Sequence, residues 1–300
     1  LPKVLAGKKV SVSPYISTYS EGMNGSCSPK DLETMLQLVH LYFTAPRADQ
    51  EAFTSNMERT KAMLKNMELN PMITLSDSLN KVLYNNHPLT VRMKAEDYDK
   101  VDYAKAMEMY KDRFADPNNF TFTFVGNIDL ETFKPLVEKY LASLKKNKRK
   151  EDWKNIGLAV NDDNYVTHYR KEMQDPKTSV YMIYNGDMEY NLYNDTYMDV
   201  LSDVLDIVYT KSIREEQGGT YGVGVMGSIN NRPENDFRFL IAFDTNDEVY
   251  ATLMDIAKAG LKDIAENGPR QEDLSKVLEN KLKKRTEELQ ENKFWTNTIV

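Results

Sequence analysis

The sequence predicts an α+β fold of two related domains, in which mainly antiparallel sheets carry helices packed on one face. Two observations support this prediction. Residues 120–144 and residues 237–264 each combine an alternating strand pattern, a short Asn/Asp turn and a long amphipathic helix. The chain of 300 residues is also long enough for two domains of about 100 to 200 residues each. The repeated pattern is compatible both with duplication and with convergence of the two halves.

Composition and charge argue against several classes of protein. The net charge of −7 leaves no strongly basic face for the phosphates of nucleic acid. No apolar run approaches the roughly 18 residues that span a bilayer, so no membrane span is expected. The single cysteine, Cys27, excludes an internal disulfide and a four-cysteine zinc site. The chain begins at Leu1 without a signal-peptide pattern, which suggests a mature or excised piece.

The first half of the chain is expected to be mostly helical. It opens with a strand at 9–13 that Pro14 interrupts, and a glycine turn is expected at 22–25. The sequence 28–31 supplies an N-cap serine and a capping-box acid for a helix that ends at Pro46. Further helical patterns cover 50–68, 76–84 and 102–114.

The clearest strand pattern is Phe120–Val125, in which phenylalanines alternate with threonines. Asp129 is expected to cap a helix that runs to about Leu144. Because apolar residues recur along one side of that helix, we expect it to lie on the aromatic face of the strand.

A domain boundary is expected in the polar run 145–152, where charge replaces hydrophobic periodicity. The domains are therefore placed at 1–147 and 148–300. The basic part of this run, Lys145–Lys150, is interpreted as a solvated linker. In the second domain the patterns predict strands at 166–171 and 179–184, a turn at 185–187, a helix at 195–214, an antiparallel pair at 220–229 and 236–243, a helix at 246–267 and a charged helix from Arg270.

The histidines do not have the spacing that a zinc site on a helix requires. His40, His87 and His168 stand far apart, and neither H-x-x-E-H nor H-E-x-x-H occurs. We therefore expect no metal site in this chain. Nucleophile-elbow and phosphate-loop motifs are absent as well. The acidic stretches at 162–163 and 244–248 lack calcium-loop spacing and are interpreted as solvated loops.

The stretch 213–221 is the most informative part of the sequence. Arg214 and Tyr221 stand on either side of Gly218 and Gly219, where a helical pattern changes to a strand pattern. The two glycines allow both polar side chains to be directed into one cleft, where they could clamp peptide backbone or a carboxylate. On spacing alone, the simpler interpretation is an arginine that complements a helix C-terminus and a tyrosine that starts a strand.

Residues 213–225, 124–129 and 43–47 resemble the pitrilysin/insulinase family of zinc metallopeptidases, the inverzincins. The resemblance covers nearly the whole chain and is strongest to the C-terminal half of the large bacterial, PqqL-like members. It implies two α/β-roll domains of the LuxS/MPP-like metallopeptidase fold. Residues 1–147 would be the third peptidase domain, without its first strands, and 148–300 would be the fourth.

The resemblance also implies a function. In that family the N-terminal half holds zinc through H-x-x-E-H, and the C-terminal half closes the chamber and contacts the peptide substrate. Arg214 and Tyr221 would bind substrate, and Tyr221 would also donate a hydrogen bond to the developing oxyanion. The partners would be the N-terminal half of the same polypeptide and a peptide. Because this chain lacks the zinc motif, it should not cleave peptides alone.

The sequence is also compatible with a different class of function. The chain could be a non-catalytic scaffold, similar to the respiratory-complex core subunits that share this fold, and Arg214 and Tyr221 would then be dispensable. The bacterial members of the family favour a periplasmic location, with the cytoplasm as the alternative.

Overall fold

The computed structural model describes residues 3–146 and 151–299, and its internal contacts divide the chain into two compact units. Unit 1 comprises Leu1–Thr74, Pro88–Ile156 and Glu291–Val300. Unit 2 comprises Leu75–His87 and Gly157–Gln290. Each unit is therefore built from stretches that are not contiguous in the sequence. The boundary expected at 147/148, together with much of the basic run, lies outside the described residues.

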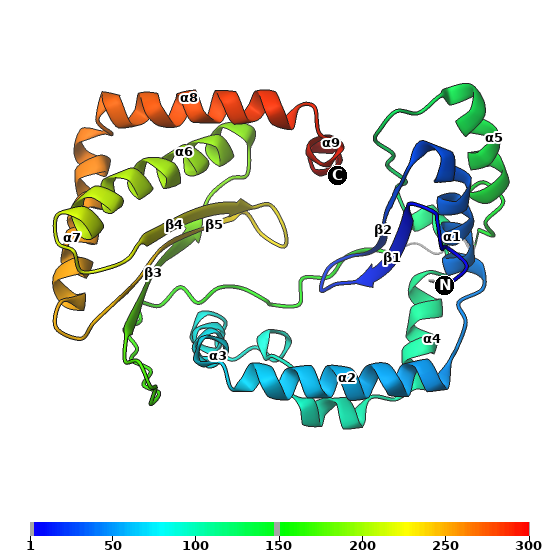
Figure 1. Ribbon diagram of the computed structural model, residues 1–300, viewed down its shortest axis with the longest axis horizontal. Coiled ribbons are helices and arrows are strands. Elements are labelled where there is room, and N and C mark those ends of the chain that lie inside the picture. Colours follow the sequence, from blue (N-terminus) through cyan, green and yellow to red (C-terminus); the bar gives the residue numbers. More distant parts are fainter. Residues whose placement is uncertain (1–2, 147–150, 300) are drawn as a thin grey trace. The chain divides into compact units, whose positions relative to one another are not determined.

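Unit 1 is mainly helical, as the sequence predicts (Figure 1). Its antiparallel sheet pairs β1 (Val10–Ile16) with β2 (Glu21–Cys27). Its α-helices are α1 (Leu32–Thr44), α2 (Gln50–Glu68), α4 (Tyr103–Arg113), α5 (Leu130–Tyr140) and α9 (Asn292–Ile299). Helix α3 (Pro71–Leu83) begins in unit 1 and ends in unit 2. Short 3-10 helices lie at Pro29–Asp31, Pro88–Thr90, Ala95–Lys100 and Pro117–Asn119.

The core of unit 1 forms on both sides of α1. One side buries Met35 and Leu38 against Val12 of β1. The other side buries Leu36 against Leu141 and Leu144, which follow α5. The apolar residues of α1 therefore pack against two neighbours, the β1–β2 pair and α5.

The predicted strand Phe120–Val125 is wrong, because this segment joins no sheet within the described residues. A strand needs a neighbour to satisfy its backbone groups, and side-chain alternation cannot supply one. Its aromatic side chains instead pack on helices: the ring of Phe120 lies 5.1 Å from that of Phe43 on α1, and Phe124 lies 5.0 Å from Phe133 on α5. The expected contact between this segment and α5 is thus confirmed.

Two expectations at the N-terminus are also corrected. Strand β1 continues through Pro14. Proline lacks a backbone N–H, and a strand tolerates it where that group would face an unpaired edge; among the described residues β1 pairs with β2 on one edge alone. The expected turn at 22–25 lies inside β2. A Cβ at Gly22 would lie 2.7 Å from the hydroxyl of Tyr15 on the paired strand, so the glycine leaves room for the tyrosine ring.

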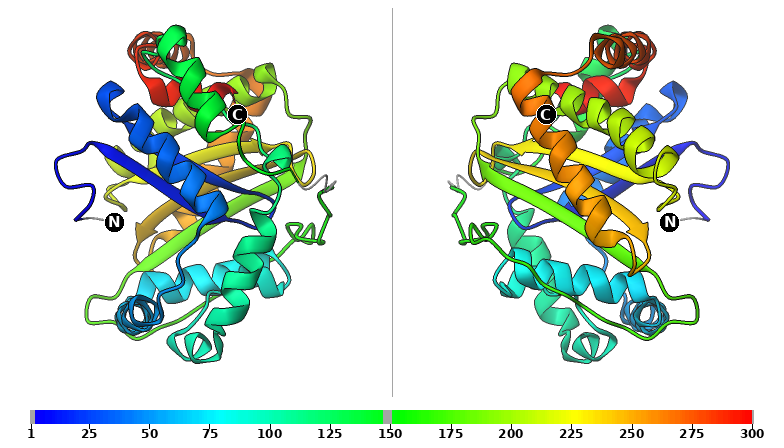
Figure 2. Two further views of the ribbon diagram at one scale, coloured as in Figure 1. Left: turned by 90° about the vertical axis from the view of Figure 1, so that its right-hand side faces the viewer. Right: turned by 90° about the vertical axis from the view of Figure 1, so that its left-hand side faces the viewer.

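Unit 2 is an antiparallel sheet in the order β3-β5-β4, with helices on one face. Its strands are β3 (Thr178–Asp187), β4 (Val223–Asn230) and β5 (Asp236–Thr245). Its helices are α6 (Leu192–Tyr209), continued by a π-helical turn (Thr210–Glu215), α7 (Tyr250–Asn267) and α8 (Gln271–Glu288). The right-hand view of Figure 2 shows α6 and α7 crossing one face of this sheet.

The core of unit 2 lies between this sheet face and the helices. Leu205 and Tyr209 of α6, Ile213 of the π-helical turn and Ile241 of β5 are fully buried there. At Gly227 the helix approaches β4 so closely that a Cβ would lie 2.4 Å from the sulfur of Met198. The absence of a side chain at Gly227 therefore allows α6 to pack on β4.

The α+β class, the antiparallel sheets and the β4–β5 pair are confirmed. Two predictions for unit 2 are wrong. Residues 166–171 form no strand in the part of the chain that is described, and the expected turn at 185–187 is the end of β3. There Gly186 pairs with Phe237, whose ring covers it, so cross-strand packing overrides the local turn signal.

No helix among the described residues is long and apolar enough to cross a bilayer.

Candidate functional site

Arg214 lies at the end of the π-helical turn that continues α6. Its neighbour Ile213 is fully buried and anchors the turn in the core of unit 2, whereas Arg214 itself is exposed. The backbone N–H of Gly218 donates to the carbonyl of Arg214 at 3.1 Å, and Gly218 has a φ of +61°. Glycine adopts this left-handed conformation without the steric cost that other residues pay, so it closes the helical end here.

Gly219 fixes the connection that leads to Tyr221. Its carbonyl accepts a hydrogen bond of 2.6 Å from the hydroxyl of Thr245, at the end of β5. A Cβ at Gly219 would lie 3.0 Å from Leu253 of α7. The connection between the two candidate residues is thus held against both the sheet and a helix.

Tyr221 projects from this anchored connection into solvent, with 98% of its surface exposed. It lies inside a turn in which the Thr220 hydroxyl bonds the backbone of Gly222, and strand β4 begins at Val223. Arg214 and Tyr221 belong to the same connection of unit 2, but no hydrogen bond joins them in the described structure. Both polar groups are therefore available to a ligand.

A polar cluster that the sequence did not indicate lies at the same end of the sheet. The ammonium of Lys177 lies 2.6 Å from the carboxylate of Asp244, and the Ser179 hydroxyl also donates to that carboxylate. Burial acts to raise the pKa of Asp244, but these two hydrogen bonds outweigh it and the pKa is lowered. The strand pairing of Ser179 with Asp244 creates the cluster, so the linear sequence carries no signal for it.

The three histidines lie on separate elements. The imidazole of His40, on α1, has Nδ1 2.7 Å from the carbonyl of Tyr140, whereas His87 follows α3 and His168 is exposed in a loop. Across residues 3–146 and 151–299, no group of three or more His, Cys, Asp or Glu side chains could hold a metal ion. The described residues thus offer no donor set for zinc.

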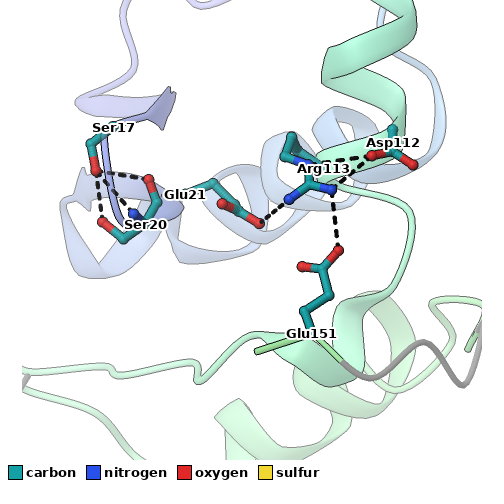
Figure 3. A network of polar contacts seen from close by, with 6 residues as sticks. All are labelled: Ser17, Ser20, Glu21, Asp112, Arg113 and Glu151. Atoms are coloured by element: carbon teal, nitrogen blue, oxygen red, sulfur yellow. Dashed lines mark hydrogen bonds and ion pairs between the residues drawn. The ribbon is translucent and has the colours of Figure 1, made fainter. Parts of the chain in front are cut away.

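Unit 1 contains a separate network around Arg113, drawn in Figure 3. Its guanidinium lies 2.8 Å from Asp112, 3.3 Å from Glu151 and 4.0 Å from Glu21. These contacts join the end of α4 to the start of β2 and to the segment after α5. The network links elements within unit 1, and it includes neither Arg214 nor Tyr221.

Comparison with known proteins identifies related chains. The sequence profile described as the peptidase M16 inactive domain matches residues 100–281. A zinc protease PQQL-like protein of Arabidopsis thaliana is 26% identical over 287 residues, which cover 90% of this chain and 30% of that protein. The probable zinc protease PqqL of Haemophilus influenzae is 22% identical, over 71% of this chain and 22% of its own length.

Solved structures have the same fold. The periplasmic protease PqqL of Escherichia coli matches with a TM-score of 0.84 at 20% identity, over 99% of this chain and 33% of that protein. A peptidase M16 inactive domain of Pseudomonas fluorescens matches with a TM-score of 0.66 at 17% identity, over 89% of this chain and 65% of that one. This chain spans a third or less of the length of the zinc proteases that it matches.

Proposed function

Because the chain belongs to the family of peptidase M16 inactive domains, we propose that it is the C-terminal, substrate-binding and chamber-closing half of a zinc-dependent metalloendopeptidase that cleaves peptides. The observation that carries this proposal is the anchored connection at 214–221, which lies inside the matched region and exposes one arginine and one tyrosine. The N-terminal half of the same polypeptide would hold the zinc, and this chain alone would be inactive.

The two side chains would have different roles. The guanidinium of Arg214 carries a fixed fork of donors, which suits it to holding substrate carbonyls or a carboxylate by charge-assisted hydrogen bonds. The phenol of Tyr221 can donate to the oxygen that becomes negative as a peptide bond is attacked. Residues 1–147 and 148–300 would correspond to the third and fourth peptidase domains. A periplasmic location is proposed by analogy with the protease of Escherichia coli.

Complementation tests this proposal. The 300-residue chain and the N-terminal half of its polypeptide are expressed separately, and cleavage of a quenched fluorescent peptide is measured for each half and for the mixture. We expect turnover from the mixture alone and loss of turnover with a zinc chelator. Size-exclusion chromatography establishes that the complex forms. A zinc-loaded complex of both halves without peptide cleavage would contradict the proposal.

The scaffold alternative predicts another result in the same assay. If the chain only supports the partner half, replacing both Arg214 and Tyr221 by alanine should leave turnover unchanged. The proposed function predicts that this double variant forms the complex and loses turnover.

A further inference from the structure

Among the described residues, β4 is an edge strand with no partner on its outer side. It pairs with β5 along its full length, and β3 occupies the opposite edge of the sheet. Within the described residues, no hydrogen bond joins the outer edge of β4 to another segment. Alternate N–H and C=O groups of an edge strand point away from its partner, so β4 presents a row of unused donors and acceptors.

β4 also lacks the features with which proteins usually block an edge. Its eight residues, Val223–Asn230, include no charged side chain and no proline. The residues on the face away from α6 are exposed, among them Met226, with 64% of its surface accessible. An accessible and uncharged edge is complementary to the backbone of another extended chain.

The opposite edge of the sheet provides a contrast. Lys177 and Ser179 bond Asp244 of the neighbouring strand β5, so those contacts leave the outer edge of β3 as it is. Near its end, the side-chain amide of Asn185 donates to the carbonyl of Asn161 at 3.4 Å, so a preceding loop lies against that part of β3. β4 has no comparable contact with a loop in the described part of unit 2.

The position of Arg214 gives the edge a direction. The π-helical turn that carries Arg214 packs on β4, and β4 begins two residues after Tyr221. A peptide antiparallel to β4 would bring its C-terminal end to the start of the strand, where the exposed guanidinium could bind a carboxylate or the last carbonyls. A parallel peptide would bring its positively charged N-terminus there instead.

Glycines leave room for the side chains of such a peptide. A Cβ at Gly222 would meet no described atom within 4 Å, and one at Gly224 would meet only the carbonyl of Ala242, at 3.9 Å. We propose that the outer edge of β4 binds an extended segment of the peptide substrate, antiparallel, with its C-terminal end toward Arg214. This inference rests on the proposed function and assigns the edge as a substrate-binding element of the same site.

Hydrogen exchange of the 300-residue chain tests the assignment. The probe is a fluorescein-labelled peptide of about ten residues, the length of a long strand, rich in Thr, Val and Ser and with a free C-terminal carboxylate. Its dissociation constant is measured by fluorescence anisotropy, and amide exchange is followed by mass spectrometry. We expect the bound peptide to slow exchange within 223–230. Absence of binding, or binding that protects other segments alone, would overturn the inference.

A pair of lysine substitutions locates the contact. Met226→Lys places a charge at the exposed face of β4, whereas Leu282→Lys places one on α8, where the leucine is 71% exposed. We expect Met226→Lys to weaken peptide binding roughly tenfold or more, because an edge lysine opposes strand addition, and Leu282→Lys to leave it unchanged. Circular dichroism shows whether both variants are folded. Equal affinity of the two variants would contradict the assignment.

The direction of the peptide has its own test. Amidation of the peptide C-terminus should weaken binding by roughly tenfold in the wild-type chain and have little effect in Arg214→Ala. If amidation weakened peptide binding equally in the wild type and in Arg214→Ala, the result would contradict the antiparallel orientation.

The outcomes also separate this inference from the proposed function. If complementation restores cleavage and Met226→Lys cleaves as well as Leu282→Lys, the function stands and the edge assignment falls. If the peptide protects β4 but the two halves yield no cleavage, the binding edge stands and the peptidase proposal falls.

Discussion

At the scale of single residues, Tyr209 shows how the core of unit 2 accepts a polar group. Its ring is fully buried, and its hydroxyl donates to the carbonyl of Ala257 on α7 at 2.7 Å. A Cβ at Gly260 would lie 2.8 Å from this ring, so a glycine makes space for it. Burial raises the pKa of Tyr209, with a smaller contribution from Tyr184. The phenol therefore stays neutral and acts as a hydrogen-bond donor between α6 and α7.

Tyr209→Phe should destabilise the protein by about 1 kcal/mol, because it removes one buried hydrogen bond and keeps the packing of the ring. Urea unfolding followed by circular dichroism measures the change. The control is Tyr221→Phe, which alters an exposed phenol and should leave the free energy of unfolding unchanged. Similar unfolding curves for the two variants would contradict the role given to Tyr209.

Asp31 is expected to make the stability of unit 1 dependent on pH. Its side chain is only 5% exposed and accepts hydrogen bonds from the Ser28 hydroxyl at 2.6 Å and from the Lys9 N–H at 2.9 Å. The bond from Ser28 is the main reason why the pKa of Asp31 is lowered, and the bond from Lys9 adds to it. The expected capping box is thus replaced by a contact between the two side chains and a bond to the residue before β1.

A lowered pKa in the folded state means that the ionised Asp31 stabilises the protein above its unfolded pKa of about 3.9, and that this stabilisation is lost as the pH falls through the folded pKa. Asp31→Asn should therefore lower the melting temperature at neutral pH. The difference from wild type should shrink below about pH 4. Thermal unfolding across this pH range measures it, and a difference that is constant down to low pH would count against this account.

At the scale of elements, the contact between β4 and α6 depends on Gly227. A Cβ there would lie 2.5 Å or less from two atoms of Met198 and 2.8 Å from the hydroxyl of Ser202. Gly227→Ala should cost about 1 to 3 kcal/mol, because the helix or the methionine must move. Gly224→Ala, on the same strand, is the matched control, since its Cβ would meet only the Ala242 carbonyl at 3.9 Å.

Differential scanning calorimetry of both glycine variants compares them directly. Gly224→Ala should be neutral or slightly stabilising, because alanine loses less chain entropy than glycine on folding. A Gly227→Ala variant as stable as Gly224→Ala would show that α6 does not depend on this close approach.

The sequence predicts best those elements whose residue pattern agrees with the partners that the fold supplies. The hydrophobic face of α1 and the alternation along β4 and β5 each lead to the observed element. Phe120–Val125 has the same alternation, but a ladder also requires a second strand, which a local pattern cannot reveal. Gly186 is in a turn-like sequence, yet its cross-strand neighbour Phe237 decides its conformation.

The residues of the candidate site could be predicted because they lie close together in the sequence, whereas their surroundings could not. The sequence 213–221 places Arg214 and Tyr221 around two glycines, and the resemblance gives these residues their expected roles. Spacing alone could not predict that Ile213 is buried while both polar side chains are exposed. The unpaired edge of β4 was likewise not predictable, because it depends on the strand order of the sheet.

At the scale of the whole molecule, the chain belongs to a family named for inactive domains, and it spans a third or less of the zinc proteases that it matches. Its described residues offer no donor set for zinc but expose one arginine and one tyrosine on a connection held by Gly219. On this basis we propose, as the central claim, that this half contributes substrate contacts and that the other half contributes the metal.

The most direct test of that claim is kcat for peptide cleavage by the full-length polypeptide carrying Tyr221→Phe. Loss of one oxyanion donor should lower kcat roughly a hundredfold to a thousandfold, with zinc content and thermal stability unchanged. The matched control is Tyr193→Phe, at a tyrosine of the same unit that is 75% exposed, which should keep wild-type activity. A Tyr221→Phe enzyme that cleaves peptides as fast as the Tyr193→Phe enzyme would contradict the account.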